Sequence, residues 1–208
     1  MPMKPKSLLI VSPSVAVALM LTANAIAVPI GYVANLSGAT EVPPNGSPGT
    51  GSVTAIFDLA AHTFDLHVTF SGLTTPTIAS HIHAPTLAPA SGKAGVATQV
   101  PSFVGFPLGV TSGTFDQTFN TLDVSFYNPA FVTANGGTVA GAEAAFAQAL
   151  DEHKAYLNIH TENFPGGEIR GFLRVASVPE AIPTMVCLGM GLIGLGMFRR
   201  KFEPRPNG

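Results

Sequence analysis

The sequence predicts an all-β fold in which short antiparallel strands form a sandwich. Stretches in which apolar and polar residues alternate recur between turn signals through the middle of the chain. Glycine (22 residues) and proline (18 residues) are abundant, tryptophan is absent and only 11% of residues are charged, which suits short strands and tight turns better than a helical bundle. The single cysteine, Cys187, follows this region, so neither a disulfide nor a thiolate metal site is expected within it.

Seven stretches carry the strand pattern. The clearest begins at Thr63, where apolar residues at even positions from Phe64 to Phe70 alternate with polar residues at odd positions. This alternation predicts a half-buried antiparallel strand with His67 facing solvent, and it leaves His62 on the surface in the preceding turn. The predicted strands are 30–36, 52–58, 63–70, 77–83, 110–119, 155–161 and 168–175.

One helix interrupts the strand pattern between Gly136 and His153. Thr138 can cap its first turn, and the alanine-rich stretch that follows favours helix. We expect this short helix to cover an edge or an open end of the sandwich. The segment 85–108 is rich in Pro, Gly, Ala and Ser and is predicted to be a loop with one short strand near 95–98.

The N-terminal residues 1–27 have the pattern of a secretory signal peptide. Lys4 and Lys6 precede an apolar run at 8–21, and small residues at the spacing that signal peptidase reads come directly after it. We therefore expect export of the remaining chain, with the domain occupying residues 28–177.

A second apolar run, at 181–198, has the pattern of a short transmembrane helix. At about 1.5 Å per residue its eighteen residues reach roughly 27 Å, just enough to cross a bilayer core. The basic cluster Arg199, Arg200 and Lys201 follows it and is expected to remain in the cytoplasm. The domain upstream would then lie outside the inner membrane.

The tail 178–208 resembles the PEP-CTERM sorting signal of Gram-negative bacteria. The residues that carry the resemblance are the signature Val178, Pro179 and Glu180, the short glycine-rich span and the basic cluster. The resemblance implies cleavage near the signature by an exosortase and delivery to the cell surface or the extracellular matrix after transient anchoring in the inner membrane. Ala181 departs from the pattern, because a second proline usually stands there.

The exported region is acidic. Residues 28–180 contain four Lys or Arg and eleven Asp or Glu, which gives a formal net charge of −7. A domain of this charge repels nucleic acid and anionic lipid, so neither is an expected partner.

Three histidines in strand patterns form a candidate metal site. His81 and His83 are two residues apart on one predicted strand, so both side chains project from the same face and can bind one ion. His160, on a later strand, completes a set of three if the two strands are neighbours, which is the ligand set of a zinc or copper site. The alternative is a structural cluster whose rings hydrogen-bond carbonyls or carboxylates. The carboxylates that can add an oxygen ligand are Glu41, Glu162 and Glu168.

Glu168 and Arg170 form a second candidate pair at the same two-residue spacing. They are expected to form an ion pair along the strand or to hold His160 from the next one. Together with Glu41 and Asn158 they make up a predicted structural network that explains the motif without any reaction.

Five stretches of the exported region, in order, resemble the CHRD domain, the domain repeated in chordin. The closing stretch is the most specific, because it combines N-I-H-T, Pro-Gly-Gly and E-I-R-G at fixed spacing. The resemblance implies an immunoglobulin-like or Greek-key antiparallel β-sandwich and, in bacteria, an exported protein. The five stretches are LSGATEVPP (36–44), TGSVTAIFDL (50–59), VTFSGL (68–73), SHIHAP (80–85) and YLNIHTENFPGGEIRGFL (156–173).

The stretch 68–85 also resembles the segment of copper-zinc superoxide dismutase in which both histidines of an H-x-H motif ligate copper. The likeness ends there, since no further cluster of His and Asp supplies zinc ligands and no cysteine pair is present in this region.

These features favour a non-catalytic binding or adhesion module at the cell surface or in the matrix, with exopolysaccharide or surface proteins as partners. The alternative is a copper- or zinc-dependent redox or hydrolytic enzyme that uses the three histidines.

Overall fold

The structure is a computed structural model that describes residues 28–177. The predicted signal peptide at 1–27 and the predicted sorting tail at 178–208, with its span at 181–198 and its basic cluster, lie outside the described residues. Within the described range, no helix is both long enough and apolar enough to cross a membrane.

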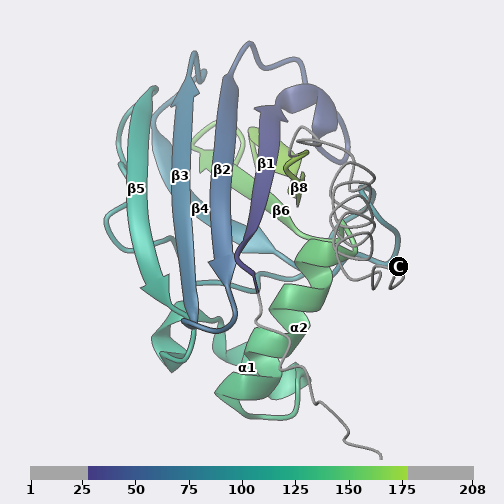
Figure 1. Cartoon of the computed structure of the whole chain (residues 1–208). Coiled ribbons are helices and arrows are strands. Elements are labelled where there is room, and N and C mark those ends of the chain that lie inside the picture. Colours follow the sequence, from purple (N-terminus) through teal and green to yellow (C-terminus); the bar gives the residue numbers. More distant parts are fainter. Residues whose placement is uncertain (1–27, 178–208) are drawn as a thin grey trace, which may run out of the picture.

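The described chain folds as a curled antiparallel sheet with few helices, as the all-β prediction required. The strand order is β4-β6-β7-β1-β2-β3-β5, and β8 pairs with β1 beside β7. Figure 1 shows β1, β2, β3 and β5 as one layer, with β4 and β6 passing behind it. The strands are β1 (Ile30–Ser37), β2 (Thr50–Asp58), β3 (Thr63–Ser71), β4 (Thr77–His83), β5 (Gly113–Asn120), β6 (Tyr156–Thr161), β7 (Ile169–Phe172) and β8 (Arg174–Val175).

The core lies between the two layers and is built from the alternating apolar residues of the strands. In β3, Phe64, Leu66 and Val68 are buried, whereas the polar residues between them are partly exposed. Aromatic rings form the centre of the core: Phe64 makes an edge-on contact with Phe146 at 5.4 Å between ring centroids. Burying each such ring contributes about 1.5–3 kcal/mol, so packing is a main source of stability in this core.

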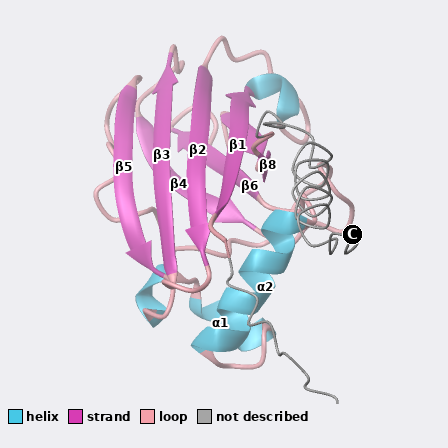
Figure 2. Ribbon diagram, viewed as in Figure 1, coloured by secondary structure: helices cyan, strands magenta, loops and turns pink. Residues whose placement is uncertain are grey.

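The helices α1 (Pro129–Ala134) and α2 (Val139–Asp151) lie toward the lower end of the sheet in the view of Figure 2. As predicted, α2 begins after Thr138, whose hydroxyl accepts a hydrogen bond from the backbone N–H of Gly141. The short helix α1 was not predicted. Its signals are local ones, a capping Asn128 followed by proline at the first helical position. Two 3-10 turns complete the elements, η1 (Gly38–Thr40) and η2 (Val124–Phe126).

Two predicted strands are shorter than expected. The run 110–119 enters the sheet only at Gly113, because the carbonyls of Val110 and Thr111 accept hydrogen bonds from Thr77 at the start of β4 and from Leu73 in the turn before it. The run 168–175 is divided at Leu173, whose N–H donates to Ala155 while the next residue turns to pair with β1. Both differences arise from contacts with distant segments, which local alternation does not encode.

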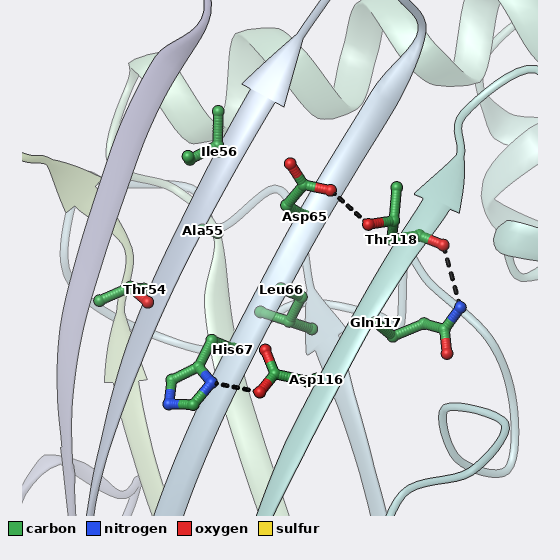
Figure 3. A pocket seen from close by; sticks show the side chains of 9 residues that line it. All are labelled: Thr54, Ala55, Ile56, Asp65, Leu66, His67, Asp116, Gln117 and Thr118. Carbon is green, nitrogen blue, oxygen red and sulfur yellow. Dashed lines mark hydrogen bonds and ion pairs between the residues drawn. The ribbon is translucent and has the colours of Figure 1, made fainter.

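The outer face of β2, β3 and β5 is an open, polar surface (Figure 3). His67 faces solvent, as predicted, and is partly exposed; its Nδ1 lies 2.9 Å from the carboxylate of Asp116. Asp65 accepts a hydrogen bond of 2.6 Å from Thr118 on the same face. His62 departs from the prediction of a free surface residue, because its Nδ1 lies 3.0 Å from the buried carboxylate of Glu143 on α2.

Candidate functional site

The candidate site lies on the outer face of β4, β6 and β7, the layer opposite the surface of Figure 3. The strand register sets its plan: His81 of β4 is paired with Asn158 of β6, which is paired in turn with Arg170 of β7. His83 is paired with Tyr156 in the next row, and His160 follows Asn158 by two residues on β6. Because side chains two residues apart share a face, Asn158 stands at the centre of this group.

The structure brings His81, His83 and His160 together. One nitrogen of each ring lies within 4.8 Å of the corresponding nitrogens of the other two rings. The closest pair is His81 Nε2 and His160 Nε2, which lie 3.0 Å apart. The ring centroids of His81 and His83 are separated by 4.7 Å, as are those of His81 and His160.

Each of the three rings is oriented by a backbone carbonyl. His81 Nδ1 lies 3.1 Å from the carbonyl oxygen of Pro101, His83 Nδ1 lies 2.9 Å from that of Ala94, and His160 Nδ1 lies 3.0 Å from that of Pro165. A carbonyl oxygen only accepts, so every Nδ1 must carry the proton. The neutral tautomer of each ring therefore presents an unprotonated Nε2, and all three Nε2 lone pairs belong to the cluster.

Loops that pack over β4 and β6 supply these carbonyls. The loop after β4 returns along its edge, with Ala97 and Phe103 donating backbone hydrogen bonds to Ile82 and Ser80. This return places Ala94 and Pro101 beside the rings of β4. Pro165 belongs to the turn between β6 and β7, so each acceptor lies in the segment that follows the strand of its histidine.

Burial favours the neutral form of all three rings. It lowers the pKa of His81 to about 3 from an ordinary value of 6.5, with the neighbouring His83 and His160 adding to the effect. It lowers the pKa of His83 to about 4, although the carbonyl of Ala94 opposes the shift. The pKa of His160 is also lowered, mainly by burial. Imidazole binds metal in its neutral form, so these rings are ready to ligate without first losing a proton.

Tyr156 packs against the ring of His83 and against the guanidinium of Arg170. The ring of Tyr156 lies nearly parallel to that of His83, with 4.8 Å between centroids and an interplanar angle of 7°. The guanidinium carbon of Arg170 lies 4.6 Å from the centroid of Tyr156. Arg170 is itself buried, and its positive charge contributes to the lowered pKa of His83.

Glu41 is the acidic partner of Arg170. Its Oε2 lies 3.7 Å from Arg170 Nε, and both side chains are buried. Burial raises the pKa of Glu41 while the charge of Arg170 opposes that rise. The Oε1 atom of Glu41 and the Oδ1 atom of Asn158 are buried without a hydrogen-bond partner, and so is Nε2 of His83. A buried acceptor without a partner favours a positively charged or hydrogen-bond-donating species beside it, and His83 Nε2 is such an acceptor within the histidine cluster.

Glu168 departs from the predicted network. Its carboxylate accepts hydrogen bonds from Ser47 Oγ at 2.5 Å, Thr74 N at 2.7 Å and Thr161 Oγ at 2.5 Å, and it does not pair with Arg170. The two-residue spacing predicted that Glu168 and Arg170 share one face of a strand. Glu168 instead precedes β7 and lies in the turn, where strand alternation no longer applies. Glu162, a predicted oxygen donor, is exposed and is not part of the metal-competent set, and the same set leaves out Glu41 and Glu168.

Sequence reasoning missed the role of Tyr156. The signal was present, because Tyr156, Asn158 and His160 alternate along β6 and therefore share a face. The carbonyl acceptors Ala94 and Pro101 left no such signal, since main-chain groups are common to every residue.

The comparison with known families agrees with the motifs that end in this site. The CHRD domain matches residues 32–173, which include all of β1 to β7 apart from the first two residues of β1. No curated protein and no solved structure matches the chain. The match spans more than half of the sequence, and the chain therefore belongs to the CHRD domain family.

Proposed function

We propose that this chain is an exported CHRD-domain protein that binds a transition-metal ion through His81, His83 and His160. It acts as a binding module, and the ion is its ligand. Support for export comes from the sequence patterns at 1–27 and 178–208, which we propose are processed by signal peptidase and an exosortase to release the domain at the cell surface or into the matrix. Exopolysaccharide or other surface proteins are the partners that we propose at that location.

The observation that carries the metal proposal is the contact between His81 and His160. Their Nε2 atoms lie 3.0 Å apart, yet both Nδ1 atoms already hold the ring proton by donating to carbonyls. Two lone pairs at this distance repel each other unless a positive species lies between or beside them. Burial acts against a proton here, because it disfavours the charged form of both rings and lowers the pKa of each. A metal ion satisfies both nitrogens at once, and the three rings together offer it three ligand nitrogens.

The spacing suits an ion with nitrogen ligands. For a metal–nitrogen distance of about 2.05 Å, two nitrogens 3.0 Å apart subtend about 94° at the ion. A tetrahedral ion needs about 3.4 Å between its ligands, so the widest pair, within 4.8 Å, must close by up to about 1.4 Å. Small rotations of the rings provide a movement of this size without shifting the strands.

The donor set limits which ion binds. Calcium and magnesium require oxygen ligands, whereas imidazole nitrogen suits zinc and copper. The Nδ1–carbonyl hydrogen bonds are the supporting contacts that metal-bound histidines usually make, because they set the tautomer and increase the basicity of Nε2. Zinc and copper are therefore the ions to test.

Substitution by asparagine separates the two roles of each ring. The carboxamide nitrogen of asparagine occupies the position of Nδ1 and can still donate to the carbonyl, while Nε2 is removed. In the full chain purified in detergent, we expect one zinc or copper ion per molecule, and a loss of affinity of more than about 100-fold in His81→Asn or His160→Asn. His67→Asn, on the opposite face, is the matched control and should bind normally.

Stability of the metal-free protein distinguishes the proposal from a structural role. If the rings exist to bind metal, His81→Asn removes a repulsive contact and leaves the metal-free protein as stable as before, within about 0.5 kcal/mol. A structural cluster predicts the reverse, with no stoichiometric metal in the parent and a clear loss of stability in the variant. That pair of results would refute the proposed function.

A further inference from the structure

The charge and enclosure of the three-histidine site decide between the two candidate ions. We infer that the site is built for copper in the +1 state and discriminates against Zn(II), so that its ligand is the cuprous ion. This inference rests on the proposed function and adds to it the identity and charge of the ion. It follows from the ligand charge, the burial, the neighbouring cation and the number of ligands.

The ligands contribute no negative charge. The metal-competent set contains three imidazoles, and no carboxylate or thiolate of the described chain joins it. All three rings are neutral ligands, because the carbonyl facing each Nδ1 keeps one proton there and the ion takes the lone pair of the other ring nitrogen. The full charge of the ion therefore remains on the site: one unit for Cu(I) and two for Zn(II).

Burial makes this difference costly. His81 and His160 are each 7% exposed, and the Nε2 atom of His83 is buried. The cost of transferring an ion from water into such an environment grows with the square of its charge, so a dication loses roughly four times as much hydration energy as a monocation of similar size. Neutral ligands do not offset this loss with an opposite charge, and the monocation is favoured.

The nearest buried cation adds to the discrimination. Arg170 lies 4.6 Å from the centroid of Tyr156, whose ring lies 4.8 Å from that of His83. Its guanidinium is thus no more than about 10 Å from the His83 ring. At an effective dielectric constant of about 20, repulsion over this distance lowers the affinity of the site roughly tenfold for each unit of charge on the ion. Glu41 offsets part of this charge, since its Oε2 lies 3.7 Å from Arg170 Nε.

The number of ligands leads to the same ion. Zn(II) in proteins takes four ligands, and a three-histidine zinc site completes its shell with water. Here the cluster is enclosed by the loops that hold Pro101, Ala94 and Pro165, and His83 Nε2 has no contact with solvent. Cu(I) is stable with three nitrogen ligands and needs no water. A site that is closed to water suits retention of the reduced ion more than exchange of a fourth ligand.

Asn158 provides an isosteric test of the charge argument. It is the cross-strand neighbour of His81, and its Oδ1 is buried without a partner, so Asn158→Asp adds a negative charge beside the site with little change in shape. The added charge should favour the dication, and at about 6 Å it should shift the ratio of Zn(II) to Cu(I) affinity upward by roughly 10- to 100-fold. Asn35→Asp, on the exposed outer face of β1, is the control with the same charge change.

The experiment compares competition titrations of the full chain in detergent with Cu(I), under anaerobic conditions, and with Zn(II), each against a chromogenic chelator. Both use a Cys187→Ser background, because the only thiol of the sequence would itself bind Cu(I). We expect the parent to bind one Cu(I) at least about 100-fold more tightly than Zn(II). We expect Asn158→Asp to narrow that ratio and Asn35→Asp to leave it unchanged.

The outcomes separate the two proposals. A parent that binds Zn(II) as tightly as Cu(I), with His81→Asn abolishing both, overturns the inference and leaves the proposed function standing. A ratio that Asn158→Asp does not change overturns the charge argument on which the inference depends. Absence of stoichiometric binding of either ion overturns the inference and the proposed function together.

Discussion

Replacing Glu168 with glutamine removes one buried charge and preserves the shape of the side chain. Glu168 is 0% exposed, and its carboxylate accepts hydrogen bonds from Ser47, Thr74 and Thr161. These three donors belong to the loop before β2, the turn between β3 and β4, and the end of β6. One carboxylate thus joins segments that are far apart in the sequence, and its loss weakens the fold at the point where the two layers meet.

The structure gives the size of the effect. A hydrogen bond to a charged group contributes about 1.5–3 kcal/mol, and one between neutral groups contributes about 0.5–1.5 kcal/mol. Neutralising the acceptor therefore costs about 1 kcal/mol for each of the three bonds. In addition, the glutamine NH₂ group must face one of the hydroxyls, which then has to rotate and accept. We expect Glu168→Gln to lower the free energy of unfolding by about 3 kcal/mol.

Urea unfolding of the metal-free protein measures this loss, and Glu162→Gln, at an exposed position in the same turn, is the control with an expected change within about 0.5 kcal/mol. Burial acts to raise the pKa of Glu168, but the hydrogen bonds outweigh it and hold that pKa below its ordinary value. The stabilisation is therefore complete above the unfolded pKa of about 4.3 and is lost as the pH falls through the folded value. A loss below about 1 kcal/mol at pH 7, or a gap between parent and variant that persists undiminished at pH 2–3, would refute the reasoning.

Three further measurements test other parts of the structure. The free energy of unfolding of the metal-free protein should fall as the pH falls from 6.5 toward 4, by up to about 1.4 kcal/mol per pH unit for each ring. The reason is that the unfolded chain binds protons in this range, whereas His81 (pKa about 3) and His83 (pKa about 4) stay unprotonated in the folded protein. An unfolding midpoint that does not depend on pH in this range would contradict the prediction. Gly167→Ala should cost at least about 2 kcal/mol by urea unfolding, since φ is +123° and a Cβ would lie 2.5 Å from a buried carboxamide; Gly166→Ala, which meets nothing within 4 Å, should cost clearly less. Phe146→Ala should cost about 3–5 kcal/mol in the same assay, because the ring is 0% exposed and lies within 6.1 Å, between ring centroids, of other core phenylalanines; a cost below about 1 kcal/mol would mean that α2 does not seal the core.

The predicted ends of the chain require a different measurement. Mass spectrometry of the protein from its native host should find a start near Val28 and an end near Glu180 if both predicted processing steps occur. Detection of Arg199 in the mature surface protein would show instead that the tail is retained.

Local patterns in the sequence were enough to predict most of the strands and the longer helix. The alternation from Phe64 to Phe70 predicted β3 and the exposure of His67, because side-chain direction in a strand depends only on residue parity. Thr138 predicted the start of α2, because capping is a contact between near neighbours. The H-x-H spacing likewise placed His81 and His83 on one face before any fold was known.

Only the tertiary structure decided which residues meet across strands and loops. The register of β4 against β6 brings His160 to His81, and nothing in either strand alone specifies that pairing. The carboxylate of Glu168 finds hydroxyls in place of the predicted Arg170, because the chain leaves the strand geometry one residue before β7. Main-chain carbonyls orient every ring of the site, and a backbone atom carries no residue-specific signal. The physical reason is the same in each case: a sequence encodes local geometry directly, whereas contacts between distant segments depend on how the whole core packs.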